Sequence, residues 1–294
     1  STLELAVLSQ VNLIMFGKSR MAHLINDGTD LHAWFAAQLM GITYEDILSR
    51  LGSRDARAKQ MRQLAKIPNF GLPGGLGVKG LVRYALNYGV SLEPDTPTMA
   101  PSGVQLPSAR DLVRAWMSAF PEMREYFAHL SHESDLSADG RFTVRQFGSN
   151  RVRGGSTYTA AANTFFQGLA ADGAKAAMWR LFVACYLDQR SALFGCRAWN
   201  FIHDEFLLIG PRDTAHEWAP EASRIMVEAM KAYTPDVKQE APPALMTRWY
   251  KDADPVYTPD NTLIPWVPVS DLPSEATEAM PDGLTKTQQV LYAS

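Results

Sequence analysis

The stretch FIHDEFLLIG, residues 201–210, places two adjacent carboxylates between two apolar runs. Apolar runs on either side of a short polar break predict a buried hairpin over 196–210, with two antiparallel strands joined by a tight turn. Asp204 and Glu205 lie at this break, and ionised carboxylates in an apolar hairpin are costly unless a positive charge offsets them. Mg²⁺ suits that role because it takes carboxylate oxygens and keeps positions open for phosphates. The stretch therefore predicts a hairpin that carries a metal site.

A second interpretation of this turn is that both acids are solvent-exposed turn residues. Adjacent strand residues point to opposite faces, so even in a metal site we expect one acid to ligate and the other to act nearby. His203, which precedes the pair, is by itself more typical of a hydrogen-bonded structural histidine than of a ligand. The segment alone leaves these alternatives open.

The segments around the hairpin are mainly helical, and a second hairpin is predicted over 139–158, around FGSNR. Helical apolar spacing occurs over 3–25, 29–39, 44–51, 54–69, 78–89, 108–131, 159–190 and 215–232. Pro121 is expected to kink or split the helix at 108–131, and Pro68 to bend the helix at 54–69 or end it early. No regular alternation of strands and helices is found in the sequence, which argues against a doubly wound fold. We therefore predict an α+β fold that is mostly helical, with a small antiparallel sheet. Residues 257–294 are rich in Pro, Asp, Thr and Ser, so an extended arm or partial disorder is expected there.

Composition excludes several classes of protein. With 294 residues and 46% hydrophobic content, the chain can bury a large core in one or two domains. Cys185 and Cys196 have no ligand-type spacing, which argues against a zinc site or a disulfide framework. No membrane span and no basic signal-peptide start are found in the sequence, so we expect a cytoplasmic protein without a membrane partner. The net charge of −3 gives no general attraction to nucleic acid.

Positive charge is nevertheless concentrated in RDARAKQMRQLAK, residues 54–66. Arg62, Lys66 and Phe70 follow at i, i+4 and i+8, so they fall within an arc of roughly 80° on one helix face. Two neighbouring cations repel unless an anion lies between them, and a polyphosphate would bind both, with the ring beyond them able to stack on a base. The alternative is an amphipathic helix with Phe70 in the core and the cations in water, and spacing alone favours that alternative.

Two further patterns are weaker. Gly75-x-Gly77-x-x-Gly80 matches a dinucleotide fingerprint by letter, but it follows a helix, so a flexible turn is the better interpretation. Asn163 and Gln167 lie at i and i+4 among small residues, where amide groups can contact the groove edges or sugars of a duplex. Hydrogen bonding within the core is the alternative for this amide pair.

The order of these motifs along the chain is more informative than any one of them. STLEL at 1–5, DLHAWFA at 30–36, Arg62-x3-Lys66-x3-Phe70-Gly71, Asn163-x3-Gln167-Gly-x-Ala-Ala-Asp and His203-Asp204-Glu205 occur in that order. This series resembles family A DNA polymerases, of the DNA polymerase I type, and is most similar to their phage members. The resemblance runs from residue 1 to about 253 and implies the carboxy-terminal palm and fingers portion.

The resemblance implies a role for each of these side chains. Arg62, Lys66 and His32 would bind the triphosphate of an incoming dNTP, and Phe70 would stack near the nucleotide. Glu4 would exclude a 2′-hydroxyl. Asn163, Gln167 and His203 would contact primer–template DNA. Asp204 would bind the metal ion, and Glu205 would assist Asp204. Lys66 would also protonate the leaving pyrophosphate.

The implied reaction is two-metal nucleotidyl transfer, in which the primer 3′-hydroxyl attacks the α-phosphate of the dNTP with Mg²⁺ as cofactor. The cation-bearing helix and the acidic turn are then expected to face each other. The implied subdivision is a palm segment at 1–40 after the motif A strand, fingers at 41–130, palm at 131–256 and a tail at 257–294. The implied location is the cytoplasm of a bacterial cell or a phage-infected host.

The sequence also departs from the family pattern. In the family, the second metal-binding Asp lies two residues before STLEL, and the thumb and exonuclease domains are amino-terminal to it. We therefore expect this chain to be inactive alone and to need the amino-terminal part of the polymerase, on the same or a separate chain. Gly74 stands where many relatives have the Tyr of the fingers helix, and Thr159 where some have Arg.

Two other functions fit parts of the same pattern. One is a catalytically inactive remnant that holds primer–template DNA, which would bind DNA without dependence on Asp204 or nucleotide. The other is a metal-dependent nuclease that uses Asp204 and Glu205. The nuclease is the weaker alternative, because the sequence shows no further carboxylate cluster with the pair.

Overall fold

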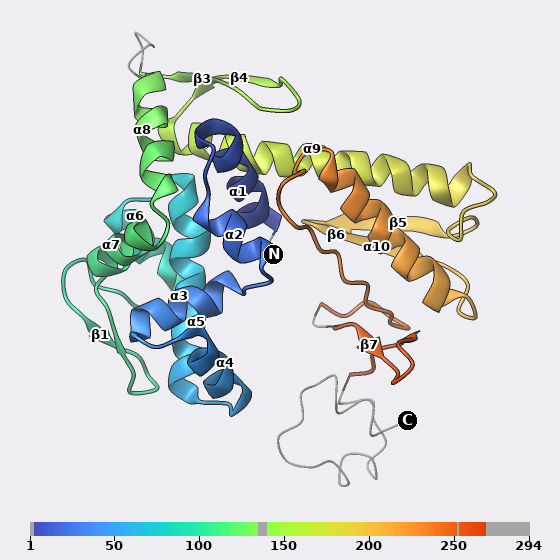
Figure 1. Cartoon of the computed structure of the whole chain (residues 1–294), viewed down its shortest axis with the longest axis horizontal. Coiled ribbons are helices and arrows are strands. Elements are labelled where there is room, and N and C mark those ends of the chain that lie inside the picture. The colour runs from blue at the N-terminus through green and yellow to red at the C-terminus, as the bar shows by residue number, and fades with distance from the viewer. Residues whose placement is uncertain (1–2, 135–139, 252, 269–294) are drawn as a thin grey trace. The chain divides into compact units, whose positions relative to one another are not determined.

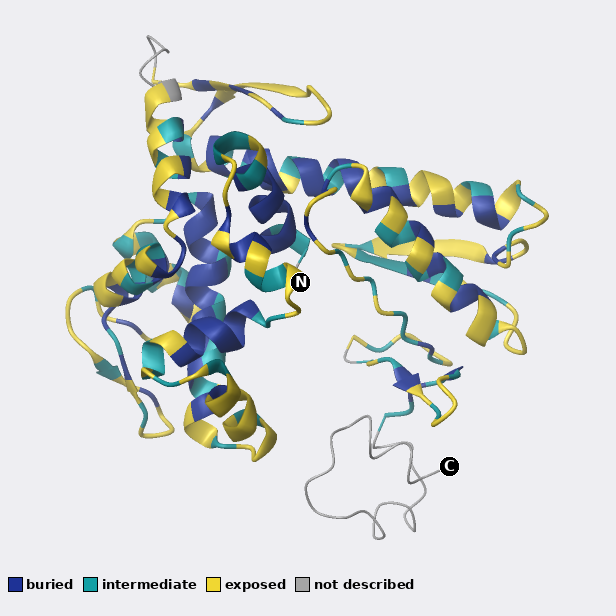
Figure 2. Ribbon diagram, viewed as in Figure 1, coloured by how far each residue is buried: buried dark blue, intermediate teal, exposed yellow. Residues whose placement is uncertain are grey.

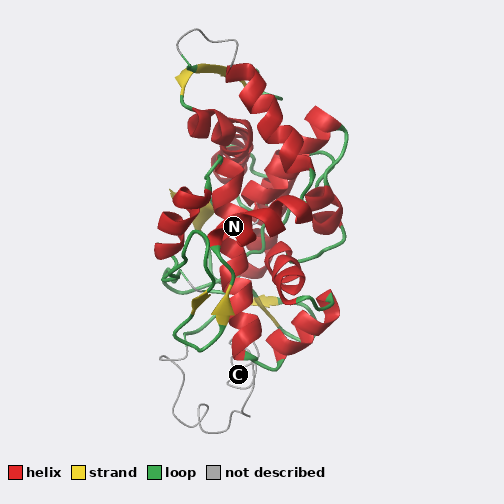
Figure 3. Ribbon diagram, turned by 90° about the vertical axis from the view of Figure 1, so that its left-hand side faces the viewer, coloured by secondary structure: helices red, strands yellow, loops and turns green. Residues whose placement is uncertain are grey.

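The computed structural model describes residues 3–134, 140–251 and 253–268, and helices make up most of this part of the chain (Figure 3). The helices are α1 (Leu3–Phe16), α2 (Arg20–Asn26), α3 (Leu31–Met40), α4 (Tyr44–Gly52), α5 (Ala56–Gly71), α6 (Val78–Leu86), α7 (Ala109–Ala119), α8 (Glu122–Ser134), α9 (Tyr158–Tyr186) and α10 (Ala215–Lys231), with a 3-10 turn, η1, at Leu72–Gly74. The strands are β1 (Thr98–Met99), β2 (Gln105–Leu106), β3 (Phe142–Arg145), β4 (Val152–Ser156), β5 (Arg197–Ile202), β6 (Glu205–Ile209), β7 (Val256–Tyr257) and β8 (Leu263–Ile264). These strands pair two by two, always antiparallel. The predicted α+β class is confirmed.

The chain forms two compact units. The first comprises Ser1–Asp172 and Tyr233–Lys238, and the second comprises Gly173–Ala232 and Gln239–Ser294. Each unit is described below by itself.

In the first unit, α1 is buried on almost every side, as expected for a helix that is apolar all round. Helix α3 packs against α5, and α7 packs against both. Phe35, Leu64 and Ile67 are fully buried in these helices, and Trp116 contacts Phe120 edge to face with ring centroids 5.5 Å apart. Figure 2 shows the buried residues in dark blue along α1, α3 and α5.

Side-chain caps fix where α3 and α5 begin. Asp30 caps α3 by accepting hydrogen bonds from the backbone N–H groups of His32 and Ala33, at 2.8 and 3.1 Å. Asp55 caps α5 by accepting from the N–H of Ala58 at 2.9 Å. Both caps are acidic, which also suits the positive end of a helix dipole.

The structure tests three of the predicted helix boundaries. The helix predicted over 3–25 is two helices, because Gly17 adopts a left-handed φ of 68° and Ser19 caps the second. The expected split of the 108–131 segment at Pro121 is confirmed, because α7 ends at Ala119 and α8 begins at Glu122. Of the two outcomes expected at Pro68, an early end is wrong, because α5 continues to Gly71.

The hairpin predicted over 139–158 is confirmed as β3–β4, which lies along the amino-terminal part of α9 (Figure 1). Gln146, just after β3, donates to the carboxylate of Asp172 on α9 at 3.1 Å. Gly168 allows this approach, because a Cβ there would lie 2.5 Å from Oε1 of Gln146. The rings of Phe147 and Phe165 stack at 5.5 Å. The Gly and Asp of the QGLAAD motif therefore hold the hairpin against α9.

The second unit has its own apolar core, formed by the carboxy-terminal part of α9, helix α10 and the segments around them. The core residues include Leu181, Cys185, Leu193, Trp218 and Ala222. The predicted hairpin at 196–210 is confirmed as β5–β6, in the register that pairs Ile202 with Glu205. Most of β5 is exposed, so the expectation of a buried hairpin was wrong for this strand (Figure 2).

The carboxy-terminal region predicted as an extended arm begins with β7 and β8 in the second unit, and residues 269–294 lie outside the described part of the chain. Among the described residues, no helix combines the length and the apolar character needed to cross a membrane.

Candidate functional site

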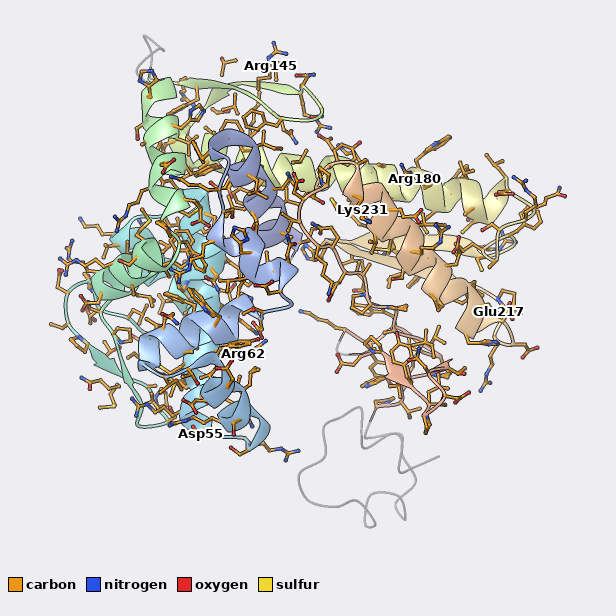
Figure 4. The ribbon with its side chains drawn as sticks, in the orientation of Figure 1. Asp55, Arg62, Arg145, Arg180, Glu217 and Lys231 are labelled. Carbon is orange, nitrogen blue, oxygen red and sulfur yellow. The ribbon has the colours of Figure 1, made fainter. Side chains whose placement is uncertain are left out.

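The basic face of α5 is partly exposed. Arg62, Lys66 and Phe70 are each half-buried, whereas Leu64 and Ile67 between them are fully buried. Figure 4 labels Asp55 at the start of this helix and Arg62 further along it. The three residues therefore share one edge of the helix, as their spacing predicts. Phe70 is not a fully buried core residue.

Arg62 is held by Asp30. Its Nε and Nη2 donate to the same oxygen of Asp30, Oδ2, at 2.9 and 2.7 Å. The other oxygen of Asp30 caps α3, so one carboxylate joins the start of α3 to the middle of α5. Burial would raise the pKa of Asp30, but the hydrogen bond and the charge of Arg62 outweigh it and lower that pKa. The guanidinium keeps Nη1 for another acceptor.

His32 lies beside this pair, at the start of α3, and is 7% exposed. Its Nδ1 is 2.9 Å from Nδ2 of Asn69, and its ring centroid is 5.0 Å from that of Phe70. Burial lowers the pKa of His32 to about 4; Asp30 opposes the shift, and the charges of Arg62 and Lys66 add to it. The imidazole is therefore neutral at pH 7.

Lys66 is the second cation of the face. It forms no hydrogen bond or ion pair with another residue in the described ranges, and its charge acts on His32. A half-buried ammonium with no protein acceptor is suited to an anionic ligand. Arg62, Lys66 and His32 thus provide two cations and a neutral ring on neighbouring helices of one unit.

Glu4, Asn163 and Gln167 lie on α1 and α9 in the same unit. Gln167 donates from Nε2 to Oε1 of Glu4 at 3.3 Å, which joins two of the predicted site residues. Asn163 donates to the backbone oxygen of Thr159 at 2.8 Å. A Cβ at Gly74 would lie only 2.7 Å from Nδ2 of Asn163. The amide of Asn163 therefore occupies the space where a side chain at position 74 would begin.

The acidic turn belongs to the second unit. His203 and Asp204 form the turn between β5 and β6, and both are exposed. His203 adopts a left-handed φ of 57°, which turns tolerate in histidine more readily than in most residues. Glu205 is half-buried and accepts a long hydrogen bond, 3.4 Å, from Nε1 of Trp249. The interpretation of exposed turn residues therefore holds for Asp204.

The turn fits one mode of Mg²⁺ binding. The described residues contain no group of three His, Cys, Asp or Glu side chains that could hold a metal ion. Mg²⁺ is, however, commonly held by one or two carboxylates together with waters and substrate phosphates. Asp204, with Glu205 next to it, fits that mode rather than an all-protein cage.

The expectation that the cation-bearing helix and the acidic turn face each other stays a prediction, because Arg62 and Asp204 belong to different units. The sequence-based roles of all these residues also stay predictions. Sequence reasoning missed three residues that contact them, Asp30, Asn69 and Trp249, and also Trp116, which donates a hydrogen bond to Asn69. Only Asp30 had a usable signal, since an Asp just before an apolar helical run is typical of an N-cap.

Comparison with known proteins identifies a family. The model of DNA polymerase family A matches residues 1–251. DNA polymerase I of Aquifex aeolicus is 27% identical over 236 residues, which cover 79% of this chain and 36% of that protein. DNA polymerase I of Deinococcus radiodurans is 25% identical over 250 residues, which cover 80% of this chain and 22% of that protein. The matched part of the chain therefore spans 36% and 22% of the lengths of these two relatives.

A solved structure has a similar fold. It is the POL domain of Pol1 from M. smegmatis, in complex with DNA primer-template and dNTP. The TM-score is 0.56 at 19% sequence identity, over 82% of this chain and 37% of that one. At this identity the match supports the fold alone.

Proposed function

The chain belongs to DNA polymerase family A, and we propose on that basis that it serves template-directed DNA synthesis, adding deoxynucleotides from dNTPs to the 3′-hydroxyl of a primer. The observation that carries the proposal is the group on α3 and α5, where Arg62, Lys66 and His32 lie together with hydrogen-bonding capacity to spare. A triphosphate is the ligand that this group fits, because it is a compact polyanion.

Each residue of the group has a proposed task. Arg62 binds a phosphate through Nη1 while Asp30 holds its other nitrogens, and Lys66 binds as a mobile point charge. His32 donates a hydrogen bond without adding charge. Phe70 stacks near the nucleotide, and Lys66 then transfers a proton to an oxygen of the leaving pyrophosphate.

We propose that Glu4, next to Gln167, excludes a ribose 2′-hydroxyl. Asn163 and Gln167 contact template and primer, and His203 contacts the primer end. A DNA primer–template and a dNTP are the ligands of the similar Pol1 structure, and the proposal extends both to this chain. The proposed subdivision stays fingers at 41–130, with palm at 1–40 and 131–256.

Asp204 is the proposed Mg²⁺ ligand of this chain, with Glu205 beside it. Bound Mg²⁺ would supply charge neutralisation at the phosphates and a lower pKa for the attacking hydroxyl. The β5–β6 register sets Glu205 opposite Ile202 and so fixes the backbone of the turn that carries Asp204.

Primer extension tests the proposal. The full chain is mixed with a labelled primer–template, dNTPs and Mg²⁺, with and without an amino-terminal family A segment that ends in the motif A Asp. We expect template-dependent extension when that segment is present, and a rate lower by about a thousandfold or more when it is left out, because its Asp contributes several kcal/mol of transition-state stabilisation through the metal ions.

Arg62→Ala should raise the KM for dNTP by about 10- to 100-fold, the effect of losing charged hydrogen bonds. Arg57→Ala is the matched control, since Arg57 is an exposed cation on the same helix, and it should change KM by less than about twofold. The inactive DNA-binding remnant would instead be favoured by two results together. Neither mixture would extend the primer, and the affinity for DNA would be the same with and without dNTP and in Asp204→Ala.

A further inference from the structure

A chain of three buried side chains leads to His32. Trp116 on α7 is fully buried, and its Nε1 donates to Oδ1 of Asn69 on α5 at 2.9 Å. Asn69 is also fully buried, and its Nδ2 is 2.9 Å from Nδ1 of His32. All three residues belong to the first unit.

The chemistry of these groups fixes the direction of each hydrogen bond. An indole nitrogen can only donate, so the Asn69 atom that faces Trp116 must be the carbonyl oxygen. The amide nitrogen then faces His32, and it also donates at 3.4 Å to the backbone oxygen of Leu31. Because that nitrogen is a donor, Nδ1 of His32 must accept and carries no proton.

We propose that Asn69, oriented by Trp116, is a positioning residue that keeps the His32 ring neutral with its one proton on Nε2. This inference rests on the proposed role of His32 at the triphosphate. Nε2 has no hydrogen bond to another residue of the described chain, and the side chain retains 7% exposure. The ring therefore presents an N–H donor, rather than a bare nitrogen, to a phosphate oxygen.

The arrangement also excludes the charged ring. An imidazolium would place an Nδ1 proton against the Asn69 amide protons, two donors facing each other. The lowered pKa of His32, due first to burial, agrees with a neutral ring. A neutral donor binds phosphate without adding to the repulsion between Arg62 and Lys66.

Nitrogen-15 NMR of the full chain, labelled at histidine, tests the tautomer without any nucleotide. The His32 signals are assigned by their loss in His32→Gln. We expect Nε2 protonated and Nδ1 bare at pH 7. Asn69→Asp presents an acceptor to Nδ1 in the same shape, so the single proton should move from Nε2 to Nδ1.

Asn12→Asp is the matched control, because Asn12 is equally buried, on α1, and undergoes the same chemical change away from His32. It should leave the His32 tautomer unchanged. Trp116→Phe keeps the ring but removes the donor that orients Asn69, so part of the population should carry the proton on Nδ1. This variant decides the question if Asn69→Asp does not fold.

The affinity for dATP is the second measurement. Asn69→Asp should bind dATP about tenfold more weakly than Asn12→Asp, the cost of one lost hydrogen bond to a charged group. Three results would overturn the inference. The first is a proton on Nδ1 of His32 in the native chain, and the second is a proton that stays on Nε2 in both Asn69→Asp and Trp116→Phe. The third is a proton that moves to Nδ1 while the affinity for dATP is unchanged. A native chain that shows the expected tautomer but does not bind dATP would contradict the proposed function and the role of this donor at phosphate, while the positioning of the ring would stand.

Discussion

The two regions that carry the predicted chemistry differ in how they are held. The α3–α5 group is fixed by hydrogen bonds from half-buried and fully buried partners. These partners are Asp30, Arg62, His32, Asn69 and Trp116. In the acidic turn Asp204 is exposed and Glu205 is half-buried, and among the described residues the carboxylates of this pair accept one side-chain hydrogen bond, the long one from Trp249 to Glu205.

The difference follows from charge. A guanidinium and a carboxylate stabilise each other, so Arg62 and Asp30 can be set in place before any ligand arrives. Two adjacent carboxylates repel, and they are held by the backbone of the hairpin and by the long hydrogen bond from Trp249 to Glu205. The α3–α5 group is therefore organised by its own charges, whereas at the acidic turn we propose that Mg²⁺ offsets the charge.

The largest expected effect lies at the turn. Asp204→Ala should lower the rate of primer extension by about a thousandfold or more, because metal binding supplies several kcal/mol of the barrier reduction. Stability should change by less than about 0.5 kcal/mol, since Asp204 is exposed. The measurement is single-turnover extension with the amino-terminal segment present. Asp213→Ala, at another exposed acid of the same unit, should leave the rate unchanged, and a loss below tenfold in Asp204→Ala would contradict the assignment.

The second effect concerns the preorganised group and depends on pH. The pKa of His32 falls from 6.5 to about 4 on folding, so between these values the unfolded chain binds a proton that the folded chain does not. Stability should therefore fall as pH drops through this window, by about 3 kcal/mol in total. Asp30 acts below the window, because its pKa is lowered from 3.8. Its stabilising contribution is present above that value and is lost only at lower pH.

Urea unfolding at pH 7 and pH 4.5 measures this effect. His32→Gln has no group at position 32 that titrates between pH 4.5 and 7, so it should lose less stability than the native chain over the same interval. Equal losses in the two proteins would show that His32 is not held neutral by its surroundings.

The smallest effect concerns Gly74. An added Cβ would lie 2.7 Å from Nδ2 of Asn163, which must move and give up its hydrogen bond to Thr159. Gly74→Ala should cost about 1 kcal/mol of stability, the usual net value of one hydrogen bond. In Asn163→Ala the same change should cost almost nothing, so a double-mutant cycle isolates the contact. An equal cost in both backgrounds would mean that Asn163 does not restrict position 74.

The sequence predicts local features of these regions well. The shared edge of Arg62, Lys66 and Phe70 follows from helical periodicity, and the β5–β6 hairpin follows from two apolar runs around a polar break. Both patterns involve residues close together in the chain, where spacing determines geometry.

Contacts between distant segments could not be predicted in this way. Trp116 and Asn69 are 47 residues apart, and no pattern in the sequence around either residue predicts their contact. Glu205 and Trp249 are separated by 44 residues. The exposure of β5 was also missed, because an apolar run shows what a strand contains and not what covers it.

The most direct test of the central claim, that α3 and α5 hold a preorganised triphosphate site, is the affinity for dATP measured in EDTA. With metal ions removed, we expect the native chain still to bind dATP. Arg62→Ala should bind dATP about 10- to 100-fold more weakly, and Asp204→Ala should bind it with the affinity of the native chain. Loss of all binding in EDTA, or equal binding by the native chain and Arg62→Ala, would contradict it.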